Sequence, residues 1–316
     1  MPEPGLVIVD KPAGMTSHDV VARVRRIAGT RRVGHAGTLD PMATGVLVIG
    51  VEQATRLLGH LTLTAKEYQA TIRLGLSTTT DDAEGEPAGG APASAVTRAD
   101  LDAGIKGLTG EISQVPPGVS AIKVNGERAY KLTRAGAAPE LKPRPVTVYD
   151  FAVTGVRPAG DYLDVDAVIG CSSGTYIRAL ARDLGAGLGT GGHLTALRRT
   201  RVGAYDIAQA QTLDQLAERF LPISLRAAAE AAFQVAGLTW EQSRRLAHGA
   251  QLPLRELGQA GQGLTAEVLA TVPPTEALAA FAPDGTLVAL VTLQSARLRS
   301  LAVFTTPDEL SGDRDE

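Results

Sequence analysis

The residue best placed by its surroundings to do chemistry is Asp40, in the stretch GHAGTLDPMATGVL at residues 34–47. Pro41 follows it and restricts its backbone to extended conformations. Glycines at positions 34, 37 and 45 permit tight turns and close approach by a ligand. A carboxylate held out on such a loop can serve as a nucleophile or as a general base. Asp40 is therefore the candidate catalytic residue.

Other side chains with catalytic or metal-binding chemistry are sparse. The sequence has one cysteine, Cys171, so it can form no internal disulfide. Its five histidines, at positions 18, 35, 60, 193 and 248, show no metal-ligand spacing with that cysteine. An apolar segment precedes Cys171, so we expect a small buried side chain there rather than a nucleophile. The sequence predicts no metal and no other cofactor.

The elements that must position Asp40 can be read from the hydrophobic pattern around it. Residues 5–10 predict a strand, and Thr16 or Ser17 can cap a helix that ends at Gly29. Residues 32–44 are rich in glycine and predict a loop, and residues 45–51 predict a second strand. Asp40 is thus expected in a loop between two ordered elements, where functional residues often lie.

The rest of the chain mixes strands and helices without a regular alternation. Strands are expected at 67–76, 146–156 and 162–170, helices at 96–108, 175–188 and within 213–232, and a long polar loop at 77–95. This order favours an α+β fold with a mixed, mostly antiparallel sheet. We expect a catalytic domain at residues 1–235, a small β-barrel domain at 236–306, and a disordered acidic tail at 307–316.

Charge is unevenly distributed behind a formal net charge of −3. Residues 11–35 hold six lysines and arginines against one acid, residues 178–201 hold five arginines against one acid, and residues 307–316 hold five acids against one arginine. Basic patches suit an RNA partner because phosphate neutralisation dominates nucleic-acid affinity. The alternative is that these arginines only solvate helix faces. No run of 18 apolar residues and no secretion signal is present, so we expect a cytoplasmic protein that does not enter a membrane.

A series of blocks along the chain is similar to one known family. In order they are VDKPAGMTSHDV, GHAGTLDPMATGVL, KEYQATIRLG, TDDAEG, VPPGVSAIKVNGERAY, RPVTVYDF, CSSGTYIRALARDLG and ALRRTRVG. These blocks extend over most of the chain and resemble the TruB family of tRNA pseudouridine synthases. The later segment LTWEQSRRLAHG is similar to the opening of a PUA domain, a small RNA-binding barrel. The resemblance implies a pseudouridine synthase core followed by a PUA-like domain.

The resemblance also implies roles for residues in the matched blocks. Asp40 corresponds to the family's essential aspartate, and Arg178 is expected to lie against its carboxylate. An arginine partner orients such a carboxylate. Tyr68 is expected to stack on the uracil ring, and Tyr176 is the candidate for removing the proton from C5 at the end of the reaction.

Four further residues are expected to bind or support the substrate. His35 would lie against the RNA beside the flipped base, and Leu197 would line the uracil pocket. Lys11 would support the catalytic loop, and Lys123 would contact the RNA backbone. For each of these residues an ordinary structural role is the alternative.

The implied reaction converts uridine 55 in the T-loop of tRNA to pseudouridine after the base is flipped out of its stack. Asp40 either attacks C1′ of the ribose or takes the proton from C2′, and the sequence leaves this choice open. We expect a monomer that works without guide RNA or accessory proteins.

Three other functions are alternatives for this sequence. An RNA chaperone would use the same surfaces without chemistry, so it would not need Asp40. A glycosidase or nucleosidase would need a second carboxylate across the scissile bond, for which Asp82 is the candidate. A synthase acting on ribosomal RNA would share the same catalytic motif.

Overall fold

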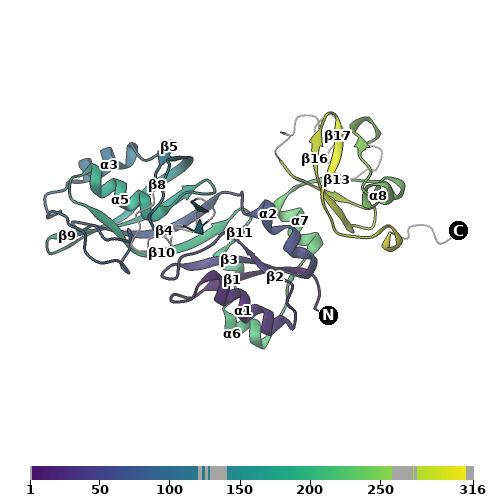
Figure 1. Ribbon diagram of the computed structural model, residues 1–316, viewed down its shortest axis with the longest axis horizontal. Coiled ribbons are helices and arrows are strands. Elements are labelled where there is room, and N and C mark those ends of the chain that lie inside the picture. The colour runs from purple at the N-terminus through teal and green to yellow at the C-terminus, as the bar shows by residue number, and fades with distance from the viewer. Residues whose placement is uncertain are drawn as a thin grey trace.

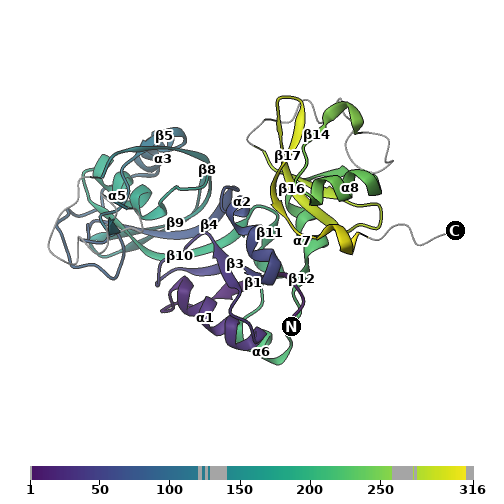
Figure 2. The ribbon, with the colours of Figure 1, turned by 45° about the vertical axis from the view of Figure 1, so that its right-hand side comes forward.

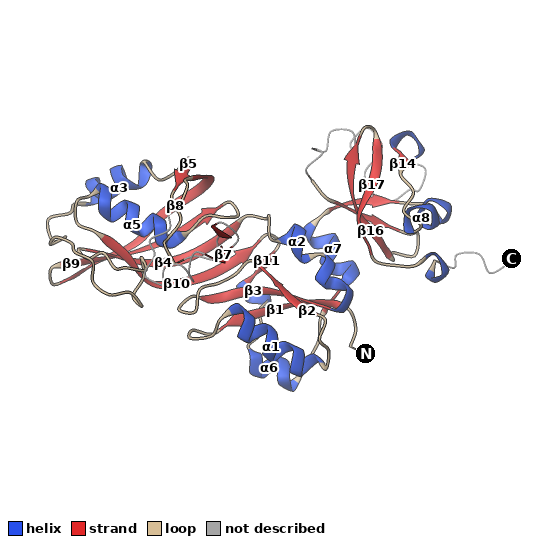
Figure 3. Ribbon diagram, viewed as in Figure 1, coloured by secondary structure: helices blue, strands red, loops and turns tan. Residues whose placement is uncertain are grey.

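The computed structural model describes residues 2–119, 123–124, 127–128, 141–257, 273 and 276–310. Figure 1 shows a large mixed part that carries the N-terminus and a smaller part that is mostly β-sheet. Figure 3 shows that strands form the body of both parts, with helices at their surfaces. The described α-helices are α1 (Ser17–Ala28), α2 (Leu58–Leu61), α3 (Arg98–Lys106), α5 (Ile177–Gly187), α6 (Leu213–Glu218), α7 (Leu225–Ala232) and α8 (Trp240–Ala247).

One large sheet runs through the first part of the chain. Its strands are β1 (Gly5–Lys11), β2 (Val33–Ala36), β3 (Thr44–Val51), β4 (Lys66–Leu74), β5 (Gly110–Gln114), β8 (Arg144–Ala159), β9 (Tyr162–Cys171), β10 (Gly192–Val202), β11 (Tyr205–Asp206) and β12 (Ile223–Ser224). The main order is β12-β1-β3-β10-β4-β9-β8-β5, with β2 paired to β3 and β11 to β10. Every described pairing in it is antiparallel except that of β3 with β10. The predicted α+β class with a mixed, mostly antiparallel sheet is confirmed.

The strand β10 joins the two halves of this sheet and was not predicted as a strand. It pairs with β4 along most of its length and touches β3 at only two positions, Arg198 with Thr44 and Arg199 with Gly45. At this crossing Gly45 has φ +96, and a Cβ there would lie 2.2 Å from the carbonyl oxygen of Arg199. Glycine is therefore required where the Asp40 loop enters β3.

Helix α1 forms as the sequence predicts. Thr16 and Asp19 make a capping box at its start, and Gly29 ends it in the left-handed conformation. Its apolar face packs on β2 and β3, with α6 beside it in both Figure 1 and Figure 2. Helices α3 and α5 cover the other half of the sheet and contact each other. Most of the shared core lies between these helices and the sheet.

One local prediction in this part is wrong. Residues 32–44 are not all loop, because 33–36 form β2, which pairs with the second half of β3. The loop that carries Asp40 is accordingly only residues 37–43. Helices α6 and α7 lie within the predicted region 213–232, and the short strand β12 between them pairs with the start of β1.

The second part is the predicted small β domain. Its five-stranded sheet has the order β13 (Gln234–Gly237), β15 (Leu278–Phe281), β16 (Leu287–Gln294), β17 (Arg297–Val303) and β14 (Leu252–Pro253), with α8 packed on β16. Since β13 pairs with β15, the predicted boundary at 235/236 falls inside a strand. Phe281 and Phe304 from this sheet share a core with Leu6 and Ile8 of β1, so the two parts pack on each other.

The chain end departs from its prediction at four residues. Residues 307–309 form a 3-10 turn, and Glu309 closes a capping box with Thr306. Leu310 is buried in the core of the small domain. The acidic tail expected from residue 307 is therefore ordered through 310, because one apolar side chain anchors it, and residues 311–316 lie outside the described part.

Candidate active site

The loop of residues 37–43 is held by polar contacts from its two neighbouring elements. The buried Ser17 hydroxyl at the start of α1 donates to the carbonyl of Leu39 (3.2 Å) and accepts from its N–H (2.9 Å). The carbonyl of Pro41 accepts from the N–H of Gly14 (2.9 Å) and from Nζ of Lys11 (3.1 Å). Asp40 is thus fixed on both sides along the chain, with its carboxylate 36% exposed.

Arg178, the second residue of α5, binds the Asp40 carboxylate with a two-point fork. Its Nε lies 3.0 Å from Oδ2 of Asp40 and its Nη2 lies 3.1 Å from Oδ1. The same guanidinium donates to the carbonyls of Thr80 (2.8 Å) and Val119 (3.0 Å). Only 4% of the Arg178 side chain is exposed. The planar fork therefore sets the direction of the carboxylate, as expected for this pair.

A second carboxylate, that of Asp82, lies at another edge of the same guanidinium. Its Oδ2 is 3.4 Å from Nη1 of Arg178, and the side chain is 5% exposed. Its Oδ1 accepts from the Thr80 hydroxyl (2.5 Å) and from the N–H of Glu84 (3.1 Å). Asp82 does not line the cavity beside Asp40. The sequence placed Asp82 only within a polar loop, and nothing local indicated that it would share Arg178 with Asp40.

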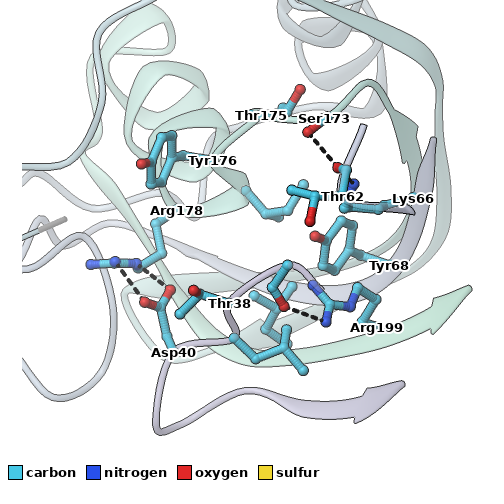
Figure 4. Close-up of a pocket in the computed structure, with 15 residues that line it drawn as sticks. Thr38, Asp40, Thr62, Lys66, Tyr68, Ser173, Thr175, Tyr176, Arg178 and Arg199 are labelled. Atoms are coloured by element: carbon cyan, nitrogen blue, oxygen red, sulfur yellow. Dashed lines mark hydrogen bonds and ion pairs between the residues drawn. The ribbon is translucent and has the colours of Figure 1, made fainter. Parts of the chain in front are cut away.

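A cavity of about 270 Å³ opens beside the Asp40–Arg178 pair. This volume is close to the lower limit of ordinary small-ligand sites. Figure 4 shows side chains from four separate segments around it, and those that bear on its chemistry are Thr38, Asp40, Lys66, Tyr68, Tyr176, Arg178, Leu197 and Arg199. The walls are therefore a carboxylate, an aromatic ring, aliphatic carbon and buried cations.

Tyr68 and Arg199 form the floor of the cavity. They are directly opposite each other on β4 and β10, and both lie inside the sheet's covered face. Burial raises the pKa of the Tyr68 phenol, which keeps the ring neutral at physiological pH. Arg199, 1% exposed, donates to the carbonyls of Val46 (2.7 Å) and Gly37 (2.9 Å). It was not singled out from the sequence, where it is one of two adjacent arginines.

Tyr176 precedes α5 and lies on the opposite wall from Tyr68 (Figure 4). The buried side chain of Gln114 holds its backbone from both sides, because the amide oxygen accepts from the Tyr176 N–H (2.8 Å) and the amide nitrogen donates to its carbonyl (3.1 Å). Leu197 of β10 also lines the cavity. The structure thus brings together five of the predicted site residues, namely Asp40, Arg178, Tyr176, Tyr68 and Leu197.

Two other predicted site residues, His35 and Lys11, lie outside the cavity wall. His35 is on β2, where its ring meets that of His18 edge to face at 5.4 Å, and its buried Nδ1 has no hydrogen-bond partner among the described residues. Burial, with His18 and Arg199 nearby, lowers the pKa of His35. Lys11 is fully buried and donates to the carbonyls of Pro12, Met15 and Pro41, which is the predicted loop support. The side chain of Lys123 lies outside the described residues.

No group of three or more histidine, cysteine, aspartate or glutamate side chains in the described ranges could hold a metal ion. Over the same ranges, no helix has the length and apolar character needed to span a membrane.

Comparison with known proteins decides the family. The model of the TruB family pseudouridylate synthase N-terminal domain matches residues 25–177, and that of the tRNA pseudouridylate synthase B C-terminal domain matches residues 178–230. The chain is 58% identical over 305 residues to tRNA pseudouridine synthase B of Thermobifida fusca, covering 95% of this chain and 98% of that protein. This chain belongs to the TruB family. The protein of the same name from Streptomyces coelicolor is 56% identical over 305 residues, which cover 95% of this chain and 97% of that one.

Solved structures support the fold of this TruB family member over nearly its whole length. The crystal structure of a Cbf5-Nop10-Gar1 complex matches with a TM-score of 0.73 and 26% identity, covering 97% of this chain and 86% of that chain. The crystal structure of the archaeal box H/ACA sRNP Nop10-Cbf5 complex matches with a TM-score of 0.70 and 26% identity, covering 97% and 88%. The match includes both the large sheet and the small β domain.

Proposed function

We propose that this protein converts uridine 55 in the T-loop of tRNA to pseudouridine, with Asp40 acting at the ribose. The observation that carries the proposal is the Asp40 carboxylate, oriented by the buried Arg178 at the wall of a small cavity with an aromatic floor. Relatives more than half identical over almost their full length are named tRNA pseudouridine synthase B, which supports tRNA as the substrate.

The reaction needs three groups that this cavity can supply. The bond from C1′ of the ribose to N1 of uracil breaks, the base turns within the site, and C5 bonds to C1′. Asp40 either forms a transient bond to C1′ or removes the C2′ proton. Tyr68 presents a neutral ring on which the detached uracil can stack, and the small volume retains it. The C5 proton then leaves to a base, for which we propose Tyr176, and N1 gains a proton.

Recognition of tRNA is proposed to rest on shape and phosphate contacts. A wider cleft of about 630 Å³ lies between α1 and the start of β3. Its lining includes four basic residues, Lys11, Arg23, Arg26 and Arg198. Arg198 is paired there with Asp10 at 2.7 Å, whereas Arg23 and Arg26 are exposed. Exposed arginines on one helix suit the phosphates of a folded RNA. His35 and Lys123 are proposed as further RNA contacts, and the enzyme is proposed to act as a cytoplasmic monomer without guide RNA.

The test is release of tritium from C5-labelled uridine in an unmodified tRNA transcript. Wild type should release the label, and Asp40→Asn should not, because the amide can neither attack C1′ nor take a proton. Asp102→Asn is the matched control, since Asp102 pairs with Arg98 on the surface of α3 at 2.8 Å, away from the cavity. A transcript with cytidine at position 55 should be inert. If the wild-type protein binds tRNA tightly but releases no tritium, the alternative function of an RNA chaperone would be favoured.

The position of Asp82 argues against the alternative function of a glycosidase. Such an enzyme needs two carboxyl groups facing the scissile bond. Asp82 is instead turned to the far edge of Arg178 and lies outside the cavity wall.

A further inference from the structure

Leu63 is the most exposed of the large apolar side chains in the described ranges, at 72%. It follows Thr62, which lines the cavity (Figure 4), and lies three residues before β4 in the sequence. An isolated exposed leucine is ordinary on a protein surface. Two features set this one apart: it is adjacent in sequence to a residue that lines the catalytic cavity, and its backbone is held by side chains that line the same cavity.

The turn that carries Leu63 is fixed by a buried lysine. Nζ of Lys66 donates to the carbonyl of Thr62 (2.9 Å) and to that of Thr64 (2.6 Å), the two residues that flank Leu63. The Thr62 carbonyl also accepts from the hydroxyl of Ser173 on the facing loop (2.8 Å). The N–H of Leu63 donates to the carbonyl of His60 (3.2 Å). The two carbonyls that flank Leu63 and its own N–H therefore all have hydrogen-bond partners.

Burying an ammonium group costs free energy unless its contacts compensate. Lys66 is 7% exposed, and none of the ion pairs found among the described residues includes it. Its described hydrogen bonds go to the two carbonyls beside Leu63. Lys66 therefore fixes the backbone on both sides of Leu63, whose apolar side chain is exposed to solvent. A side chain on a backbone that is already fixed loses less conformational entropy when it binds a ligand.

We propose that Leu63 packs against a nucleotide next to the uridine that enters the cavity, covering the base face that is exposed when the uridine leaves its stack. The proposal rests on the proposed function. Apolar side chains, leucine among them, are a known means of occupying a disrupted base step. Flipping costs the stacking energy of the target, and an apolar contact with the vacated face offsets part of it.

The experiment compares Leu63→Ala, Leu63→Met and Leu221→Ala in the full-length protein. Leu221 is the matched control because it is also exposed, at 56%, and lies between α6 and β12 away from the cavity. Kd for a tRNA transcript and the KM and kcat of tritium release are measured for each. Leu63→Ala should weaken binding and raise KM about tenfold, as expected for loss of a buried leucine contact, with kcat changed less. Leu63→Met should restore most of the binding, and Leu221→Ala should match wild type.

Transcripts with an abasic residue on the 5′ or the 3′ side of the target uridine locate the contact. With one of them the penalty of Leu63→Ala should vanish, since the partner is already gone. A penalty that persists in both transcripts overturns the proposal, as does wild-type binding by Leu63→Ala. Because Kd is measured apart from turnover, an inactive wild type whose tRNA binding still depends on Leu63 would overturn the proposed reaction and support the contact.

Discussion

Asp82 offers the sharpest test of how the site is built. In Asp82→Asn the new amide oxygen can still accept from the Thr80 hydroxyl and the Glu84 N–H, so the loop keeps both bonds. The amide nitrogen then takes the place of Oδ2, which is 3.4 Å from Nη1 of Arg178. Two donors face each other there, and Arg178 is left with Asp40 as its single carboxylate among the described residues.

The expected loss follows from the strength of that contact. Leaving a buried donor without its acceptor costs about 1–3 kcal/mol. If the guanidinium shifts to relieve the clash, the fork on Asp40 shifts with it, and kcat should fall about 10–100-fold. KM should change much less, because Asp82 does not line the cavity. The melting temperature should fall by only about 5 °C.

The assay is single-turnover tritium release at saturating enzyme, with melting curves on the same samples. Asp164→Asn is the control, because Asp164 forms a comparable fork with Arg73 at 2.7 and 2.8 Å outside the cavity. That variant should lose some stability and keep its kcat. Wild-type kcat in Asp82→Asn, or an equal loss of kcat in Asp164→Asn, would show that Asp82 does not position Arg178 for catalysis.

Three further outcomes are expected. Arg178→Lys should lower kcat at least about 100-fold, since one ammonium cannot reproduce the two-point fork and the two carbonyl contacts, as single-turnover rates will show. Burial lowers the pKa of Lys66 from 10.5 to about 8. Between these pH values the unfolded chain binds more protons than the folded protein. The contribution of this lysine to the free energy of unfolding should therefore rise with pH in that range, by up to about 3 kcal/mol. Urea unfolding at pH 7.5 and 10 should show a smaller rise in Lys66→Met than in wild type, and the remainder is expected from Lys11, because burial also lowers its pKa to about 8. Gly45→Ala should fold poorly, since its Cβ would lie 2.2 Å from the Arg199 carbonyl oxygen, whereas Gly59→Ala, with no atom within 4 Å of the new Cβ, should melt at or above the wild-type temperature.

The sequence by itself determined the parts whose causes are local. The helix from Ser17 to Ala28 follows from the capping residues Thr16 and Asp19 and from Gly29. The loop position of Asp40 follows from its proline and glycines, and the β8–β9 hairpin follows from its pattern and turn. The matched blocks named the family and, through it, five side chains that the structure gathers around one cavity.

Only the tertiary structure decided which polar side chains are buried and with whom. Arg198 and Arg199 are adjacent in sequence. Arg198 pairs with Asp10 in an open cleft, whereas Arg199 is buried opposite Tyr68 in the floor of the cavity. Arg199 can be buried because its acceptors are the carbonyls of Val46 and Gly37, more than 150 residues away. A buried charge needs partners, and those partners come from strands and loops that meet only when β10 closes the sheet.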